Sequence, residues 1–382
     1  MISSSANTGQ RLLYFLRWQV LSRLPWPHVD GVLLFLILLT CGVSLLTLYS
    51  ADGGDFRFAF NQGIRFAIGF VAMAVLASTT PQQLRRIAPW LYGITLLLLI
   101  LVTLFGEGRG AHRWLDLKII RFQPSEIMKL ALPMLLAWYF HRRVLPPTWR
   151  HLGICAILIG IPALLVAEQP DLGTALLIAG AGAFVIFLAG LSWSKIVIIL
   201  TSAALSVPLL WPHLHAYQRN RVLVLLDPES DPLGNGWNII QSKIAVGSGG
   251  LFGKGLGQGS QSQLAFLPEK HTDFILAVFS EDFGWIGVAL LMLLYFAIIA
   301  RSLWIAVQAG DTFSRLLAGA LSISFFVYVA VNSGMIAGVL PVVGVPLPLI
   351  SYGGTSAVSV LAGFGILMSI HGNRQRIGRR PA

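Results

Sequence analysis

The sequence predicts an all-α, polytopic membrane protein with about ten transmembrane helices. Of its 382 residues, 55% are hydrophobic and only 11% are charged, and its mean hydropathy is +0.75. A soluble domain carries roughly 25% charged residues, so this chain has too few charges to cover a water-exposed surface. The apolar residues also occur in runs of about 20, the length at which a helix crosses a hydrocarbon core of ~30 Å.

Apolar windows define the expected spans and divide the chain into three parts. A cytoplasmic segment (1–30) precedes a membrane domain (31–371), and a basic cytoplasmic tail (372–382) follows it. One connection, residues 212–271 between the seventh and eighth spans, is long enough to form a large extracytoplasmic loop. The predicted spans are 31–49, 63–79, 88–105, 125–141, 152–167, 173–191, 195–211, 272–300, 313–338 and 352–370.

The basic residues set the expected orientation. An even number of spans places both termini on one side, and 15 of the 27 Lys and Arg residues fall in the tails and short loops of that side. The positive-inside rule makes this side cytoplasmic. The chain is therefore expected to be a multi-pass membrane protein with both termini in the cytoplasm.

Ten of the other basic residues gather in two extracytoplasmic segments, against this preference. A loop of about 60 residues is translocated regardless of its charge, which is sufficient for the second group. The segment before the fourth span is short, so an anionic ligand at the outer membrane face explains the first group better. The groups are Arg109, Arg113, Lys118, Arg121 and Lys129, and Arg219, Arg221, Lys243, Lys254 and Lys270.

Two ionisable residues fall inside the predicted fourth span. Glu126 and Lys129 follow Pro124-Ser125, a typical helix start, and their spacing of three residues places them on one helix face. They form either an ion pair that only orients the span or a charged pair that lines a cavity. We favour the cavity, because an intramembrane charge costs several kcal/mol unless it faces a partner or water.

Acidic residues mark the outer ends of other spans. Asp171 is expected to cap the sixth span, and this capping is as good an explanation as a functional role. Thr272 is expected to cap the eighth span and to place Asp273 in its first turn, with Glu269 nearby. The alternative for Asp273 is a favourable charge at a helix N-terminus. Its position opposite the two basic segments favours a functional role.

Several other chemistries are not indicated. The glycine-rich stretch 247–259 departs from the phosphate-binding P-loop pattern and follows no strand, although a re-entrant loop whose N–H groups approach a ligand remains an alternative. Cys41 and Cys155 lie in apolar runs, and no zinc or serine-hydrolase motif occurs. The basic residues are spread over loops and a tail, which fits anionic lipid and not nucleic acid.

These residues belong to a series of motifs through which the chain resembles the SEDS family (shape, elongation, division and sporulation), and its elongation branch above all. The resemblance covers nearly all ten spans. The motifs are Gly110-x-x-Arg113-Trp114, Gln123-Pro-Ser-Glu-x-x-Lys129, Gln169–Thr174, Tyr217–Val222, Gly236–Ala245, Phe266–Phe274 and Pro346–Gly354.

The resemblance implies a peptidoglycan glycosyltransferase that polymerises lipid II into glycan strands at the outer face of the membrane, for elongation and rod shape. Its implied partners are lipid II, the nascent glycan, a class B penicillin-binding protein that cross-links the strands, and other elongation-complex proteins. Family motifs place the catalytic residue at Asp273 and functional residues at Glu126, Lys129 and Trp114. Arg113, Asp171, Arg221, Lys243, Glu269 and Ser351 complete the expected substrate-binding or cavity residues.

On this interpretation Asp273 acts as general base in a glycosyl transfer with inversion. Arg113, Lys129, Arg221 and Lys243 are the candidates for stabilising the diphosphate leaving group. A divalent cation is an alternative for that role, although no ligand set indicates one. Two other functions also predict intramembrane charges or a binding partner: a lipid II flippase and a non-catalytic scaffold for a penicillin-binding protein.

Overall fold

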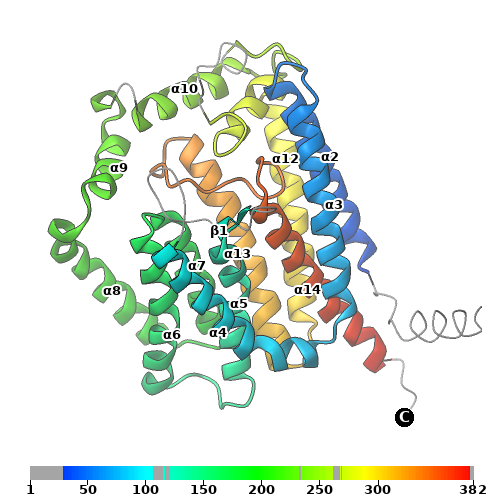
Figure 1. Ribbon diagram of the computed structural model, residues 1–382, viewed down its shortest axis with the longest axis vertical. Coiled ribbons are helices and arrows are strands. Elements are labelled where there is room, and N and C mark those ends of the chain that lie inside the picture. The colour runs from blue at the N-terminus through cyan, green and yellow to red at the C-terminus, as the bar shows by residue number, and fades with distance from the viewer. Residues whose placement is uncertain are drawn as a thin grey trace, which may run out of the picture.

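The computed structural model describes residues 29–105, 115–116, 121–231, 234–260, 267 and 269–378. Apart from one two-residue hairpin, β1 (Leu115–Asp116) with β2 (Arg121–Phe122), the regular structure in these ranges is helical (Figure 1). The longer helices are α2 (Gly31–Ala51), α3 (Arg57–Ser78), α4 (Pro81–Phe105), α5 (Pro124–Phe140), α6 (Trp149–Glu168), α7 (Leu172–Leu188), α8 (Trp193–Leu210), α9 (Ala216–Leu226), α10 (Asn235–Ser248), α12 (Ile275–Val307), α13 (Thr312–Ile336) and α14 (Thr355–Gly378).

The predicted spans correspond to α2–α8 and α12–α14, which confirms the fold class. Seven helices of the described ranges are long and apolar enough to cross a membrane, and α7 and α8 are shorter apolar helices. Helix α5 has 17 residues and carries Glu126 and Lys129. None of residues 193–209 of α8 is buried, and Figure 1 shows this helix at the edge of the molecule, away from α12 and α14.

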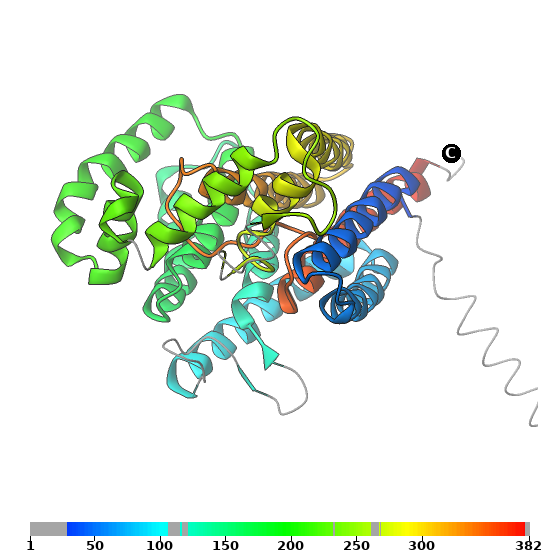
Figure 2. The same cartoon turned by 90° about the horizontal axis from the view of Figure 1, so that it is seen from above.

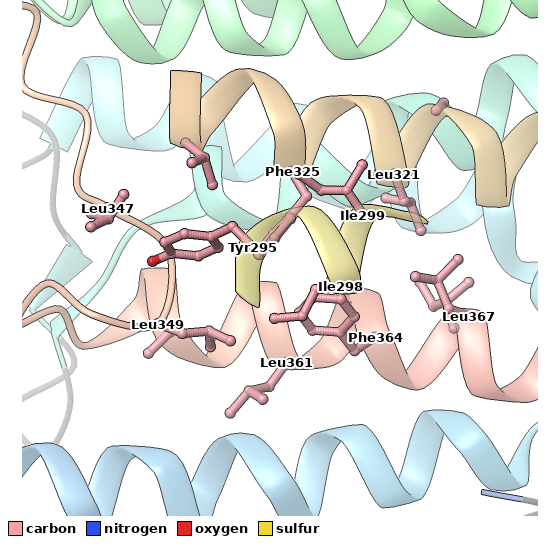
Figure 3. Packing of buried hydrophobic residues seen from close by; sticks show 14 of the residues in the cluster. Tyr295, Ile298, Ile299, Leu321, Phe325, Leu347, Leu349, Leu361, Phe364 and Leu367 are labelled. Carbon is pink, nitrogen blue, oxygen red and sulfur yellow. The ribbon is translucent and has the colours of Figure 1, made fainter. Parts of the chain in front are cut away.

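The core lies where α12, α13 and α14 meet (Figure 3). Tyr295, Phe325 and Phe364 contribute one large ring from each of these helices, and Tyr295 and Phe325 lie 5.9 Å apart between ring centroids. The Tyr295 hydroxyl donates to the carbonyl of Pro348 over 2.6 Å. Because a buried hydroxyl needs a partner, this bond fixes the segment between α13 and α14 to the core.

A buried ion pair joins three helix ends. Asp30 caps α2 by accepting from the N–H of Leu33 and receives two hydrogen bonds, of 3.0 and 2.7 Å, from Arg301 of α12 to one carboxylate oxygen. His371 of α14 lies 3.7 Å from the same oxygen. The start of the first span and the end of the last therefore lie at one end of the bundle, as an even number of spans requires. The structure continues α14 to Gly378, beyond the predicted start of the tail.

The long connection after α8, predicted as one large loop, contains helices in the residues that the structure describes. Two short 3₁₀ turns, η1 (Trp211–His213) and η2 (Pro228–Ser230), alternate in it with α9 and α10. Figure 2 shows α10 lying across the end of the bundle. The prediction that Thr272 caps the eighth span is wrong: its hydroxyl donates to Glu269, and α12 begins at Ile275 after Phe274. Asp273 consequently lies just outside the helix.

The glycine-rich stretch binds the backbone of α12 where this helix is interrupted. Gly284 interrupts this helix with φ 67° and ψ −167°. The N–H groups of Lys254 and Gly255 donate to the carbonyls of Glu281 and Asp282, and Trp285 donates to the carbonyl of Gly250. These N–H groups of the stretch bind the protein's own backbone, so for them the alternative of a ligand-facing re-entrant loop is wrong.

Replacing Gly284 by Ala is expected to destabilise the protein strongly. A Cβ atom there would lie 2.3 Å from the nitrogen of Gly253, and the backbone conformation is one that glycine alone adopts readily. Strain and overpacking together predict a loss of about 2–5 kcal/mol, measured as a fall in the unfolding temperature in detergent. Gly247→Ala is the matched control, because Gly247 has open space around it and lies in α10. An equal unfolding temperature for the two variants would contradict this account.

Candidate active site

An irregular segment between α13 and α14 holds Asp273 in place. Asn332 of α13 donates from its side-chain amide to the carbonyl of Asp273 over 2.8 Å and to that of Val345 over 2.7 Å. The Ser351 hydroxyl donates to the carbonyl of Thr272, and the N–H of Tyr352 donates to that of His271. Residues that are far apart in sequence thus fix the backbone on both sides of the carboxylate.

A cavity of about 240 Å³ opens beneath this segment. Its wall combines the first turns of α5 and α7, the end of the long connection, and residues 344–357. The structure brings five of the predicted site residues to this one cavity. They are Glu126, Lys129, Asp171, Asp273 and Ser351.

Glu126 and Lys129 form the predicted ion pair at the base of the cavity. Their charged atoms are 2.7 Å apart, and both side chains are nearly buried. Ser359 of α14 donates to the second Glu126 oxygen over 2.6 Å, and the ammonium lies 5.2 Å from the ring centre of Tyr328. Within the described ranges the Lys129 ammonium donates one hydrogen bond, to Glu126. The other two N–H groups of the ammonium can therefore bind a ligand.

Asp171 both caps a helix and lines the cavity. One oxygen accepts from the N–H of Thr174, as capping predicts, and the other accepts from the Gln123 amide over 3.4 Å. Ser351 is buried and receives the N–H of Leu347 over 2.8 Å while it donates to Thr272. These bonds give both residues a positioning role within the wall.

The Asp273 carboxylate is held in an environment that favours a proton. Burial raises its pKa to about 6, and the neighbouring Glu269 carboxylate contributes in the same direction, while Arg221 opposes them. Phe274, and not Asp273, is the N-cap of α12. The carboxylate accepts no hydrogen bond from the described residues, so Asp273 does not cap α12. A carboxylate with this pKa is ionised at neutral pH yet is a stronger base than an ordinary aspartate.

The remaining predicted site residues lie elsewhere. Arg221 of α9, Lys243 of α10 and Glu269 do not line the cavity, although Arg221 and Glu269 are close enough to act on the charge of Asp273. The alkyl chain of Lys243 lies against Gly338, at the end of α13. Arg113 and Trp114 lie outside the described residues.

Sequence reasoning missed an arginine beside the cavity. Arg65 of α3 stacks over the ring of Tyr352, 3.9 Å from its centre, and one of its terminal nitrogens is buried without a hydrogen-bond partner. Arg65 lies inside a predicted span and is an exception to the positive-inside rule. A charged residue inside a span indicates a functional site, so this position could have identified Arg65 from the sequence. Glu281 and Asp282 were also missed, but their contacts to Lys254 and Ser50 tie the glycine-rich stretch and α2 to α12.

An apolar groove adjoins the polar cavity. It has a volume of about 960 Å³ and runs between α3, α4, α5 and α14. Glu126, Gly354 and Thr355 line both spaces, and Arg65 lines the groove. In the described part of the chain no group of three or more His, Cys, Asp or Glu side chains is arranged to hold a metal ion. The arrangement accommodates an amphiphile, with an anionic head near Lys129 and Arg65 and an apolar tail along the groove.

Fold and site together define a polytopic membrane protein with a buried carboxylate and ammonium at one end of the bundle. The family model of the FtsW/RodA/SpoVE cell cycle proteins matches residues 26–376. The chain belongs to this family, which is the SEDS family that the motifs indicated.

Named relatives agree with this assignment. The chain is 51% identical to the peptidoglycan glycosyltransferase MrdB of Escherichia coli (strain K12) over 354 residues, 92% of this chain and 96% of that protein. It is 35% identical to stage V sporulation protein E of Bacillus subtilis, over 90% of this chain and 96% of that one. The solved structure of the rod shape determining protein RodA of Thermus thermophilus superposes with a TM-score of 0.70 at 29% identity, covering 91% and 98% of the two chains. A chain from a structure described as a peptidoglycan synthase complex that coordinates polymerization and crosslinking gives a TM-score of 0.79 at 34% identity, with the same coverage.

Proposed function

We propose that the protein is a peptidoglycan glycosyltransferase that polymerises lipid II at the outer face of the cytoplasmic membrane. The observation that carries the proposal is that the polar cavity, with Asp273 and Lys129 in its wall, adjoins the apolar groove and shares Glu126, Gly354 and Thr355 with it. Lipid II has a sugar, a diphosphate and a polyprenyl chain, and this arrangement offers a place for each.

In the proposed reaction the 4-hydroxyl of one GlcNAc attacks the anomeric carbon of a lipid-linked MurNAc. A new glycosidic C–O bond forms with inversion, and the C–O bond to undecaprenyl diphosphate breaks. Asp273 takes the hydroxyl proton, and a positioned base of this kind contributes typically ~10²–10⁴-fold. Lys129 and Arg65 stabilise the charge on the departing diphosphate, where burial strengthens each interaction.

The orientation and the partner belong to the same proposal. The basic residues of the short loops favour a cytoplasmic location for both termini, and in this orientation Asp273 and its cavity face the outside. The likeness to a chain of a synthase complex supports a class B penicillin-binding protein as partner, together with other elongation-complex proteins. Lys129 and Arg65 supply positive charge at the cavity without a metal ion. A divalent cation shared with the substrate is the alternative.

Fluorescent lipid II offered to the purified protein with its penicillin-binding partner tests the function. The proposal predicts that glycan polymers form even when a transpeptidase inhibitor is present, and that a muramidase degrades them. A flippase would instead move the lipid across vesicle membranes without producing polymer. A scaffold would leave all polymerisation to the partner, so activity would persist when the Asp273→Asn chain replaces the wild type.

Arg65→Gln is expected to weaken use of the lipid-linked substrate. Losing a charge-assisted contact to phosphate costs about 1.5–3 kcal/mol, which predicts a ~10–100-fold fall in kcat/KM of polymerisation. Arg57→Gln removes the same charge from an exposed site on the same helix and serves as control. Equal activity of the two variants would exclude Arg65 from substrate binding.

A further inference from the structure

A second cavity lies at the end of the bundle opposite Asp273. It has a volume of about 550 Å³, and its wall includes Arg85 and Arg86 from the start of α4 and Arg142 and Arg143 from the end of α5. Glu126 stands in the first turn of α5, and Arg142 lies two residues beyond Phe140, the last residue of that helix. A helix of this length separates the two by about 25 Å, so the arginine cavity is distinct from the candidate active site.

The four arginines lack acidic partners among the described residues. In the described part of the chain no carboxylate lies within 4.0 Å of any of them, whereas Arg301, at the same end of the bundle, is paired with Asp30. The guanidinium of Arg85 contacts Nε2 of His141, and a ring nitrogen that accepts from a guanidinium belongs to a neutral imidazole. Arg143 stacks on the ring of Tyr139, 4.0 Å from its centre, and donates to its carbonyl.

The nearest acid is already engaged. Asp311 lies 3.9 Å from Nδ1 of His141, and its two oxygens accept from the N–H and the hydroxyl of Ser314, where Asp311 caps α13. The cavity therefore concentrates four positive charges that no carboxylate of the described residues pairs with. Such a site favours an anion with several acceptor oxygens, because guanidinium groups bind phosphate in a bidentate manner.

The residues around the cavity indicate that the anion is the headgroup of an amphiphilic ligand with an apolar part. Trp138 lines the cavity and is 43% exposed, and Trp90 and Ile87 of α4 are 75% and 46% exposed. Exposed tryptophans near the ends of membrane-spanning helices are typical of the lipid headgroup level. Basic pockets between such helices bind the headgroups of anionic lipids.

We propose that this arginine cavity is a binding site for the headgroup of an anionic phospholipid. The phosphodiester oxygens lie among the four guanidinium groups, and the acyl chains cover the exposed side chains of α4 and α5. A lipid with two phosphodiesters, such as cardiolipin, uses the four charges more fully than a lipid with one.

Native mass spectrometry of the delipidated full chain in neutral detergent tests the proposal. Cardiolipin is titrated against phosphatidylethanolamine, and inorganic pyrophosphate and soluble poly-glutamate are titrated separately. Arg86 and Arg142 are exposed and have no other described contact, so Arg86→Gln and Arg142→Gln remove charge alone. Arg150→Gln, at an exposed position in the first turn of α6, is the matched control.

We expect cardiolipin to bind the wild type in preference to phosphatidylethanolamine. Each Arg→Gln change in the cavity should weaken binding about fivefold, and the double change about 20-fold, while the control stays near wild type. The Arg86→Lys/Arg142→Lys variant keeps both charges but loses the bidentate geometry, so its binding should fall between that of the wild type and that of the double Gln variant. Unchanged binding in the double Gln variant would overturn the proposal. So would pyrophosphate binding as tightly as the lipid, which indicates a soluble phosphate, or poly-glutamate displacing the lipid, which indicates an acidic protein partner.

Discussion

Purified Asp273→Asn protein is expected to polymerise lipid II at least about 100-fold more slowly than the wild type. Asparagine has nearly the shape of aspartate but cannot accept the hydroxyl proton. Because the carboxylate receives no hydrogen bond from the described residues, the substitution breaks no contact that holds the fold. Polymer formation from fluorescent lipid II, with the partner present, measures the effect.

Stability distinguishes loss of chemistry from loss of fold in this variant. Burial raises the pKa of Asp273 to about 6, so the ionised carboxylate, which predominates at pH 7, is less stable in the folded protein than in the unfolded chain. Removing that charge should leave the unfolding temperature unchanged or raise it. Asp273→Glu keeps the charge but moves it by one methylene, and a displacement of about 1 Å can also cost ~10²-fold. Near-normal polymerisation by folded Asp273→Asn would remove this residue from the mechanism.

Single substitutions of the Glu126–Lys129 pair should destabilise the protein by about 3–5 kcal/mol, because each leaves a nearly buried charge without its partner. Glu126 is 6% exposed and the Lys129 side chain 11%. Glu126→Gln and Lys129→Met are suitable changes, since both preserve approximate size. Thermal unfolding in detergent measures the free energy, and polymerisation should fall in both.

The double variant decides whether the two charges act together. Glu126→Gln/Lys129→Met removes both charges and should cost less than the sum of the single changes. Ser359→Ala is the control, because it removes one hydrogen bond to Glu126 but no charge, and it should cost about 1 kcal/mol. Additive effects of the single changes would show that the ion pair is not the source of the loss.

Hydropathy was sufficient to predict the membrane helices, because the length of an apolar run reflects the thickness of the bilayer. It could not predict the break at Gly284, since that break depends on backbone bonds to residues 250–255, which lie beyond the helix itself. The start of α12 was predicted too early for a related reason. Threonine is a common N-cap residue, but the Thr272 hydroxyl donates to Glu269 and so does not cap the helix.

The candidate site was predictable only in part. Glu126, Lys129 and Asp171 stood out as charged residues at apolar helix starts, and the structure places all three at one cavity. Arg221 and Lys243 come from neighbouring motifs but lie outside its wall, because the positions of α9 and α10 depend on contacts that no local pattern encodes. Arg65 lies beside the site because it stacks on Tyr352, which is nearly 300 residues later in the chain, and no local pattern predicts such a contact.

The pH dependence of polymerisation tests most directly whether Asp273 is the base. We expect kcat/KM to fall about tenfold per unit below pH 6, because protonation of Asp273 abolishes the base. Glu269→Gln should shift this acid limb to lower pH, since the Glu269 carboxylate helps to raise the pKa of Asp273. An acid limb near pH 4, where an ordinary aspartate titrates, or a rate that is constant down to pH 5, would contradict the account.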